Sequence, residues 1–250
     1  MQRYFLEKEH FHSDYVMITD EAAKHIRRVM RMKTGDTVVC CDEDGQCFIS
    51  EIVDLQEDYV KASILLREEK KVELPVSVTI AHGLPKADKF ELVIQKATEL
   101  GAASFIPFPG ERSVVKWEEK KADKKVERWN KIAKEAAEQA HRQIVPSVKS
   151  VMKTEELCKQ FANYTYVLVA YEEAAKNDEK SQLFSVLSRM KQGNTLLFLF
   201  GPEGGFSDRE IKLFQEHGAI ICGLGPRILR SETAPLYSLA AISYHLELLG

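Results

Sequence analysis

The feature that most constrains the fold of this chain is the change in hydrophobic pattern at Pro75. Beyond that residue, short apolar runs alternate with stretches in which apolar residues recur at helical spacing. The apolar runs are 76–82, 103–108, 165–171, 195–200 and 219–225, and the helical stretches include 88–101, 117–143 and 231–249. Near-continuous apolar strands between helices predict a parallel sheet covered on both faces, so we expect an α/β fold.

The residues before Pro75 follow a different pattern. Three short strand candidates, 37–41, 46–53 and 59–66, are separated by turns, and the turn 42–46 predicts a hairpin between the first two. Such a set of strands predicts a small β-barrel or sandwich. The polar stretch 68–75 is the expected linker, so we predict one domain at 1–72 and a second at 73–250.

Composition is that of an ordinary soluble globular protein, with 250 residues and a formal net charge of −3. No apolar run approaches the roughly 18 residues of a membrane span, and the N-terminus is too charged for a secretory signal. The five cysteines lack metal-ligand spacing, which indicates reduced thiols and a cytoplasmic protein. No histidine pair has metal-ligand spacing either, so we expect no metal. The cysteines are Cys40, Cys41, Cys47, Cys158 and Cys222.

The strand 195–200 ends in the loop GPEGG, residues 201–205. Ser207 and Glu210 then form the pattern of a helical capping box. The loop therefore joins the carboxyl end of a strand to a helix N-terminus, where open α/β sheets bind ligands. Its spacing matches neither phosphate-binding fingerprint, and Glu203 would repel an anion. A cationic or hydroxyl-rich ligand fits better; the alternative is a tight turn that binds nothing.

A second loop, within ICGLGPRILRSETAPL (221–236), repeats this arrangement. Its strand ends at Gly223 and Gly225, and Arg227 and Arg230 follow before the last helix. If the two loops lie side by side at one sheet edge, they form a pocket with charges of both signs. The alternative for the two arginines is solvated loop charge or a salt bridge.

These two loops resemble the signature of the SPOUT methyltransferases, and specifically of the uridine-N3 methyltransferases of 16S ribosomal RNA (the RsmE family). Further segments are similar to that family: 95–108 with Glu111-Arg112-Ser113, the helix with Trp129 and Arg142, and the N-terminal RYFL and HIRRVMRMKTGD. The resemblance covers nearly the whole chain. It implies a PUA-like N-terminal β-barrel that helps to bind RNA, and a catalytic domain with a C-terminal trefoil knot.

The resemblance also implies a homodimer that binds S-adenosylmethionine (SAM) mainly through the backbone of three loops. The matching cofactor positions are Leu168, Ala170, Glu172, Phe200, Gly201, Pro202, Glu203, Gly204, Gly205, Leu224, Gly225, Arg227, Ile228, Leu229, Thr233 and Ala234. The apolar last helix packs either internally or against the second copy.

Methyl transfer to uracil N3 requires removal of the N3 proton. It is assisted by a base that takes this proton or by a cation that stabilises the negative charge on the uracil carbonyl oxygens. Glu203 is the candidate base, or else a partner for the sulfonium or the ribose. Arg230 is the candidate cation that stabilises developing negative charge. Both are predicted catalytic residues.

An expected amphipathic helix at 20–33 carries Lys24, Arg27, Arg28 and Arg31 at helical spacing, with His25 beside them. This basic stripe predicts phosphate contacts once the resemblance is considered; by itself, the stripe is better explained as a solvated helix face. The complete predicted RNA-binding set is Arg3, Lys24, His25, Arg27, Arg28, Arg31, Lys86, Lys89, Arg112 and Arg142.

Three functions follow. The first is SAM-dependent methylation of uridine N3 in 16S ribosomal RNA, which we expect to be bound within the small ribosomal subunit. The second is a non-catalytic RNA-binding or ribosome-assembly factor of the same fold. The third is an α/β enzyme for a small nucleotide-like substrate. A variant of the first is a SPOUT methyltransferase that acts on a different RNA site.

Overall fold

The computed structural model of the 250-residue chain describes residues 1–114, 122–173 and 182–249. Its contacts divide the chain into two compact units. The N-terminal unit comprises Met1–Glu73 and Ala137–Val145, and the C-terminal unit comprises Leu74–Ala136 and Pro146–Gly250. This division departs from a single cut after residue 72, because a segment from the middle of the chain belongs to the first unit.

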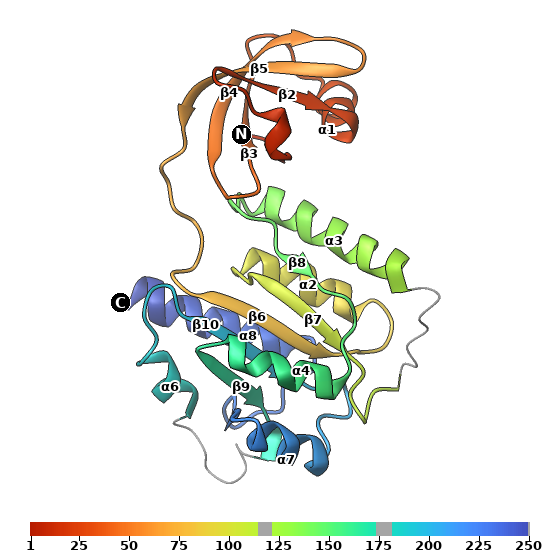
Figure 1. The fold of residues 1–250 in the computed structure, drawn as a ribbon, viewed down its shortest axis with the longest axis vertical. Helices are drawn as coiled ribbons and strands as arrows, with labels where there is room; N and C mark the ends of the chain where they lie inside the picture. The colour runs from red at the N-terminus through yellow and green to blue at the C-terminus, as the bar shows by residue number, and fades with distance from the viewer. Residues whose placement is uncertain (115–121, 174–181, 250) are drawn as a thin grey trace. The chain divides into compact units, whose positions relative to one another are not determined.

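The N-terminal unit is built on a five-stranded sheet of order β1-β3-β4-β5-β2 (Figure 1). β1 pairs with β3 in parallel and the other neighbours are antiparallel. The expected hairpin is confirmed, because the N–H of Asp42 donates to the carbonyl of Gln46 (2.9 Å). The strands are β1 (Arg3–Phe5), β2 (Tyr15–Thr19), β3 (Thr37–Cys41), β4 (Cys47–Leu55) and β5 (Tyr59–Arg67).

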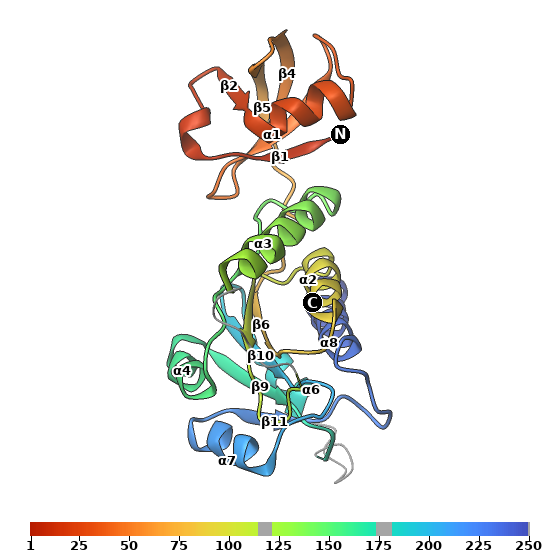
Figure 2. The same ribbon diagram turned by 90° about the vertical axis from the view of Figure 1, so that its right-hand side faces the viewer.

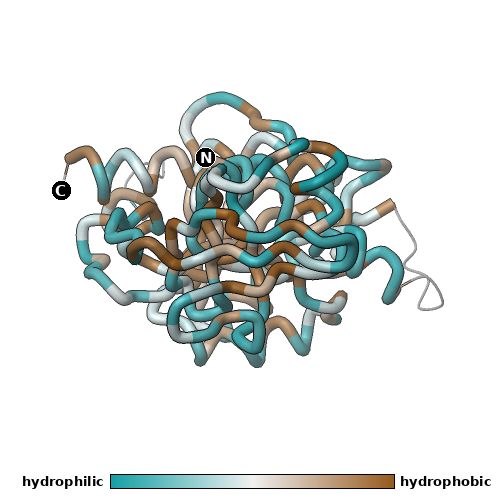
Figure 3. Tube along the Cα trace, turned by 90° about the horizontal axis from the view of Figure 1, so that it is seen from above, coloured by the Kyte–Doolittle hydropathy of each residue, from teal (hydrophilic) through white to brown (hydrophobic). Residues whose placement is uncertain are grey.

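Buried and partly exposed positions alternate along β2 and the first part of β5, as expected for a sheet with one covered face, whereas Val38 to Cys41 of β3 are all buried. In β2, Val16 and Ile18 are fully buried and their neighbours are not. Figure 3 shows how brown apolar and teal polar segments follow one another along the chain. The buried face packs on Ala23 and Ile26, which come from the helical segment between β2 and β3.

That helical segment is shorter than the predicted helix 20–33. α1 (Asp20–Lys24) continues into the π-helical turn η2 (His25–Val29), and Arg31 has the left-handed φ of 53°. The wider π turn shifts the side chains that follow it, so the spacing of an α-helix does not apply beyond Lys24. The prediction that Arg31 continues a helical stripe is therefore wrong.

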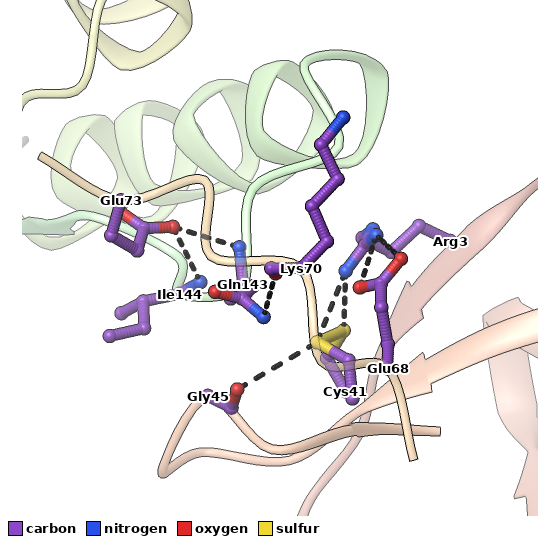
Figure 4. A network of polar contacts seen from close by, with 9 residues as sticks. Arg3, Cys41, Gly45, Glu68, Lys70, Glu73, Gln143 and Ile144 are labelled. Carbon is purple, nitrogen blue, oxygen red and sulfur yellow. Dashed lines mark hydrogen bonds and ion pairs between the residues drawn. A yellow bond between two sulfur atoms is a disulfide. The ribbon is translucent and has the colours of Figure 1, made fainter. Parts of the chain in front are cut away.

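Two arginines predicted to contact RNA are instead buried ions of this unit. Figure 4 shows the first of them, Arg3, beside Glu68. Arg3 is 2% exposed and donates to both carboxylate oxygens of Glu68 (3.0 and 2.8 Å). Arg142 is 3% exposed, and its Nε donates to Glu73 at 2.8 Å. Neither guanidinium faces solvent, so their assignment to RNA binding is corrected.

The carboxylate of Glu73 also holds the backbone of the inserted segment 137–145. It accepts hydrogen bonds from the N–H groups of Gln143 (2.8 Å) and Ile144 (3.3 Å). Ile144 then packs against the β3–β4 turn, where a Cβ on Gly45 would lie 2.9 Å from the Ile144 side chain. One glutamate thus joins the linker, the inserted segment and the hairpin region (Figure 4).

The prediction that all five cysteines are reduced thiols is wrong. Cys41 and Cys47 lie opposite each other in the hairpin and form a disulfide. Nη1 of Arg3 lies 3.0 and 3.1 Å from the two sulfurs. Cys40, Cys158 and Cys222 form no disulfide and are buried.

The C-terminal unit contains a six-stranded parallel sheet of order β11-β9-β10-β6-β7-β8. The predicted runs 103–108, 165–171 and 195–200 agree with β7, β9 and β10, whereas the run 219–225 shortens to three residues. The strands are β6 (Ser77–Gly83), β7 (Ser104–Phe108), β8 (Ser147–Val148), β9 (Tyr166–Ala170), β10 (Thr195–Phe200) and β11 (Ile220–Cys222).

Helices cover both faces of this sheet, as predicted. Leu196, Phe198 and Phe200 of β10 belong to a core with α2 and α8, whereas Leu197 and Leu199 belong to a core with α4 and α7. Figures 1 and 2 show these helix pairs on opposite faces. The helices are α2 (Lys89–Glu99), α3 (Ala122–Gln139), α4 (Thr154–Gln160), α6 (Gln182–Leu187), α7 (Asp208–Glu216) and α8 (Thr233–Ser243), the last followed by the π turn η5 (Tyr244–Leu248).

The predicted helix 117–143 differs from the structure at its C-terminal end. α3 ends at Gln139 rather than at 143, and the predicted helical residues 117–121 lie outside the described part of the chain. Within the described helices, none is long and apolar enough to cross a membrane. The C-terminal trefoil knot implied by the family resemblance stays a prediction.

Candidate functional site

A cavity of about 940 Å³ lies at the carboxyl ends of the strands in the C-terminal unit. Loops after β9, β10 and β11 line it, together with Lys89 and Arg112 from the β6 and β7 connections. Strand carboxyl ends are the edge where α/β sheets bind ligands. The lining residues in the three loops are 170–173, 200–206 with Asp208, and 224–232 with Ala234.

The two glycine-proline loops are not adjacent in the sheet. β9 lies between β10 and β11. The segment after β11 leads to α8, and α8 packs against α2 in the core that also contains β6. This segment therefore runs along the edge of the sheet from β11 towards β6. This path brings the loop 224–232 to the same cavity as the loop 200–206.

Glycines in the loop 201–205 serve mainly its own packing. Gly205 has a φ of +67°, and its N–H closes a turn by donating to the carbonyl of Pro202 (2.9 Å). A Cβ on Gly201 would lie 2.9 Å from the backbone of Gly205, and a Cβ on Gly204 would lie 2.9 Å from Cβ of Arg112. Close packing therefore requires glycine at positions 201 and 204, and the positive φ favours glycine at position 205.

The predicted capping box is confirmed and extends to a neighbouring loop. The N–H of Glu210 donates to Oγ of Ser207 (3.1 Å), and the N–H of Ser207 donates to Oε2 of Glu210 (2.8 Å). Oε1 of Glu210 accepts the N–H of Glu111 (2.9 Å). This buried carboxylate therefore fixes the start of α7 and the loop that carries Arg112.

Glu203 is paired rather than free. Its Oε1 accepts the N–H of Lys86 (3.1 Å) and lies 3.1 Å from Nζ of Lys89. The same ammonium lies 3.2 Å from Oε2 of Glu232. Partial burial acts to raise the pKa of Glu203, but the backbone donors and Lys89 outweigh it and lower that pKa below its ordinary value.

Arg227 and Arg230 line the cavity and are exposed. Within the described residues neither guanidinium has an ion pair or a hydrogen bond, so the salt bridge considered for them does not form there. Arg112 donates a long hydrogen bond to the carbonyl of Gly204 (3.3 Å). The cavity therefore offers two unpaired cations beside a loop whose carboxylate is already paired.

His82, near the end of β6, contacts the loop 224–232 through the backbone of Ser231. It is fully buried, and its Nε2 lies 2.9 Å from the carbonyl of Ser231 and its Nδ1 lies 2.6 Å from the carbonyl of Gly83. Burial lowers the pKa of His82, against the opposing effect of these carbonyls and of Glu203 and Glu232. A neutral imidazole with one N–H positions Ser231 rather than acting as a charge.

Most predicted cofactor residues line the cavity, with two exceptions. Leu168 is buried within β9, and Thr233 opens α8 without being among the lining residues. Residues that the sequence prediction missed include Tyr171, which donates to Asp208 (3.2 Å), and Glu232. Tyr171 is the last residue of the predicted strand 165–171, so its place at the ligand-binding edge of the sheet was an available signal.

The predicted RNA-binding residues separate into groups. Lys24, Arg27 and Arg28 lie on the α1–η2 segment, with Arg27 donating to the carbonyl of Glu57 and His25 within 3.0 Å of the Tyr4 hydroxyl. Lys86 is exposed near the cavity, whereas Lys89 forms ion pairs with two carboxylates.

The prediction of no metal stays a prediction. Among the described residues, Glu7, Glu9 and His10 bring ligand atoms within 4.8 Å of one another.

Comparisons with known proteins identify the family of the chain. A family model of an RNA methyltransferase domain matches residues 72–243, and one of an RNA methyltransferase PUA domain matches residues 18–65. The chain is 48% identical to ribosomal RNA small subunit methyltransferase E of Bacillus subtilis (strain 168), covering 100% of this chain and 98% of that protein.

Solved structures extend the comparison. A crystal structure of a hypothetical protein has a TM-score of 0.92 at 46% identity, and covers 100% of both chains. The ribosomal RNA small subunit methyltransferase E of Neisseria gonorrhoeae, solved with bound SAM, has a TM-score of 0.83 at 27% identity, and covers 97% of both chains. The chain therefore belongs to the family of ribosomal RNA small subunit methyltransferases E.

Proposed function

We propose that this protein transfers a methyl group from SAM to N3 of a uridine in 16S ribosomal RNA. The protein is a SAM-dependent methyltransferase of small-subunit ribosomal RNA. The proposal adds the atom that is methylated. The observation that carries it is the cavity that the unpaired Arg227 and Arg230 line together with the glycine loop and its ionised Glu203.

The residues that line the cavity fit SAM. Three loops present backbone groups for an adenosine, and Glu172, Glu173, Glu203 and Asp208 supply negative charge suited to a sulfonium. An apolar wall comes from Phe200, Phe206 and Leu229. When bound, SAM supplies an electrophilic methyl group, and the protein supplies position and electrostatics.

In the transfer, N3 of uracil loses its proton and forms a bond to the methyl carbon as the carbon–sulfur bond breaks. Negative charge builds on the uracil carbonyl oxygens as the proton leaves. We assign Arg230 to stabilise that charge, because its guanidinium has no partner in the described chain. A preorganised donor of this kind contributes roughly a hundredfold or more to rate.

For Glu203 we favour a partner of the cationic cofactor over a general base. Its pKa is lowered by hydrogen bonds and by Lys89, so it is ionised at neutral pH and a weak base. General bases work best when their pKa lies near the working pH. The N3 proton then passes to solvent.

The test is mass spectrometry of small-subunit RNA from a deletion strain. We expect one methyl group to be missing from one uridine, and to return with the wild-type gene. An unchanged methylation pattern would point to a non-catalytic assembly factor. Calorimetry with SAM adds a second check, because no binding at millimolar SAM contradicts a methyltransferase.

Single-turnover reactions separate the two assigned residues. Arg230→Ala should slow methyl transfer while SAM affinity is kept, whereas Glu203→Gln should weaken SAM binding more than it slows transfer. Near-normal transfer by both variants at saturating SAM would remove the catalytic assignment.

We also propose that the exposed Lys24 and Arg28 contact 16S ribosomal RNA within the small subunit, in the cytoplasm. Their support is the PUA domain match over residues 18–65. Charge on an exposed surface of this kind attracts phosphates in a salt-dependent manner.

A homodimer is the proposed assembly. The outer side of the last helix leaves Tyr237, Tyr244 and Leu248 exposed at 43%, 56% and 73%. Its inner side, with Leu239 and Ile242, is already buried in the core. Light scattering of the wild type and of Tyr237→Glu tests this; a wild-type monomer would contradict it.

A further inference from the structure

Lys89 occupies a position that is electrostatically unfavourable by itself. It is the first residue of α2, and a cation at a helix N-terminus opposes the helix dipole. Two carboxylates compensate: Glu203 at 3.1 Å and Glu232 at 3.2 Å from the ammonium. Lys89 therefore does not serve as the free phosphate contact that its sequence position predicted.

The three charged groups come from three separate connections. Lys89 follows β6, Glu203 follows β10, and Glu232 directly precedes α8. The two glutamates stand in two different loops of the cavity, and β9 separates the strands from which these loops emerge. Within the described residues, Lys89 is the side chain that forms ion pairs with both loops.

The ion pairs are partly shielded. The side chain of Lys89 is 33% exposed, those of Glu203 and Glu232 are 28% and 14% exposed, and all three line the cavity. Without the ammonium, two ionised carboxylates would remain close together and repel each other. The loops would then separate unless one carboxylate took up a proton.

We propose that Lys89 is a positioning residue for cofactor binding, whose ammonium joins Glu203 on one cofactor loop to Glu232 on another and so sets the spacing of the two loops. The inference rests on the proposed SAM site. Lys89 acts through the glutamates and touches no reacting atom. It therefore affects SAM affinity more than the chemical step.

The experiment measures SAM affinity by calorimetry and methyl transfer at saturating SAM for a set of variants. Lys89→Met should bind SAM roughly three- to tenfold more weakly, as expected for loss of two part-buried ion pairs, with transfer changed less than about twofold. Lys89→Arg should restore the affinity to within about twofold. Lys96→Met is the matched control, since Lys96 lies on the same helix and pairs with Glu99.

A double-mutant cycle tests the mechanism. If Lys89 acts through Glu232, Lys89→Met combined with Glu232→Gln should lose less affinity than the two single losses together. Three results would overturn the inference: a wild-type SAM affinity of Lys89→Met, a SAM affinity of Lys89→Arg as weak as that of Lys89→Met, or fully additive losses in the double variant. If Lys89→Met fails to fold, Lys89→Arg and Glu232→Gln still decide it.

The outcomes also separate this inference from the proposed function. If the wild type binds no SAM, the function itself fails. If the wild type binds SAM and methylates the RNA but Lys89→Met does the same with unchanged affinity, only the role of Lys89 fails.

Discussion

Two pairs of arginines show how differently one residue type is used in the two units. Arg3 and Arg142 of the N-terminal unit are 2% and 3% exposed, and each pairs with a glutamate. Arg227 and Arg230 of the C-terminal unit are exposed at a cavity, and no described carboxylate pairs with them. The first pair is satisfied within the chain, and the second is available to a ligand.

This difference follows from desolvation. A buried cation is tolerated only with a carboxylate and further hydrogen bonds, so it carries little information about external partners. An exposed cation stays hydrated, so it can remain unpaired in the free protein without a desolvation cost. The contrast predicts that substitutions in the first pair change stability and substitutions in the second change activity.

The largest expected effect is on catalysis. Arg230→Ala should slow methyl transfer about a hundredfold, because it removes the donor that stabilises charge on the uracil. The free energy of unfolding should change by less than about 0.5 kcal/mol, as for most surface substitutions. Single-turnover kinetics and urea unfolding measure the two. Arg128→Ala, an exposed arginine paired with Glu91, is the control and should leave transfer unchanged.

The next effect is on stability. Arg142→Met should destabilise the protein by about 3 kcal/mol, because it leaves the carboxylate of Glu73 without its cation. Urea unfolding followed by circular dichroism measures this loss. SAM affinity should stay at the wild-type value. A wild-type free energy of unfolding in Arg142→Met would mean that the ion pair with Glu73 does not stabilise the protein. The distinction between the buried and the exposed arginines would then be wrong.

A smaller effect concerns RNA binding. Replacing both Lys24 and Arg28 with alanine should weaken RNA affinity by roughly tenfold and lower the salt dependence, since each lost phosphate contact reduces the slope by about one. Filter binding over a range of salt concentrations measures both quantities. Arg3→Met should instead lower stability; if it changed the salt slope, its assignment as a buried structural ion would be wrong.

The smallest effect is a pH dependence from His82, a buried base without a carboxylate partner. Its pKa is lowered in the folded protein, so the unfolded chain binds more protons below the ordinary value of about 6.5. Stability should fall as the pH drops through this value, with a slope of at most about 1.4 kcal/mol per pH unit. Unfolding between pH 7 and pH 5 tests it. In His82→Asn the free energy of unfolding should depend less on pH. An equal slope in the variant and the wild type would mean that another group causes the pH dependence.

Local patterns in the sequence predicted most of the elements. Strands β3, β9 and β10 agree with the predicted apolar runs, because burial on one or both faces leaves a short-range signature. The capping box of Ser207 and Glu210 was predicted for the same reason, since both partners lie within one helical turn.

Long-range relations were not predictable in this way. The position of β9 between β10 and β11 depends on how separate segments pack, and no local pattern encodes it. The roles of Arg142 and Lys89 depend on Glu73 and Glu232, far away in sequence. The disulfide had an available signal, because Cys41 and Cys47 flank the turn of the predicted hairpin, and the structure pairs them across it.

Glu73 has a consequence for how this protein divides into pieces. Its carboxylate binds the backbone of Gln143 and Ile144, so the N-terminal unit is encoded by two stretches of the gene rather than one. A chain truncated at Glu73 would expose that carboxylate and the surface of Gly45 that Ile144 covers. Exchange of this unit between related enzymes therefore requires residues 137–145 to be transferred with residues 1–73.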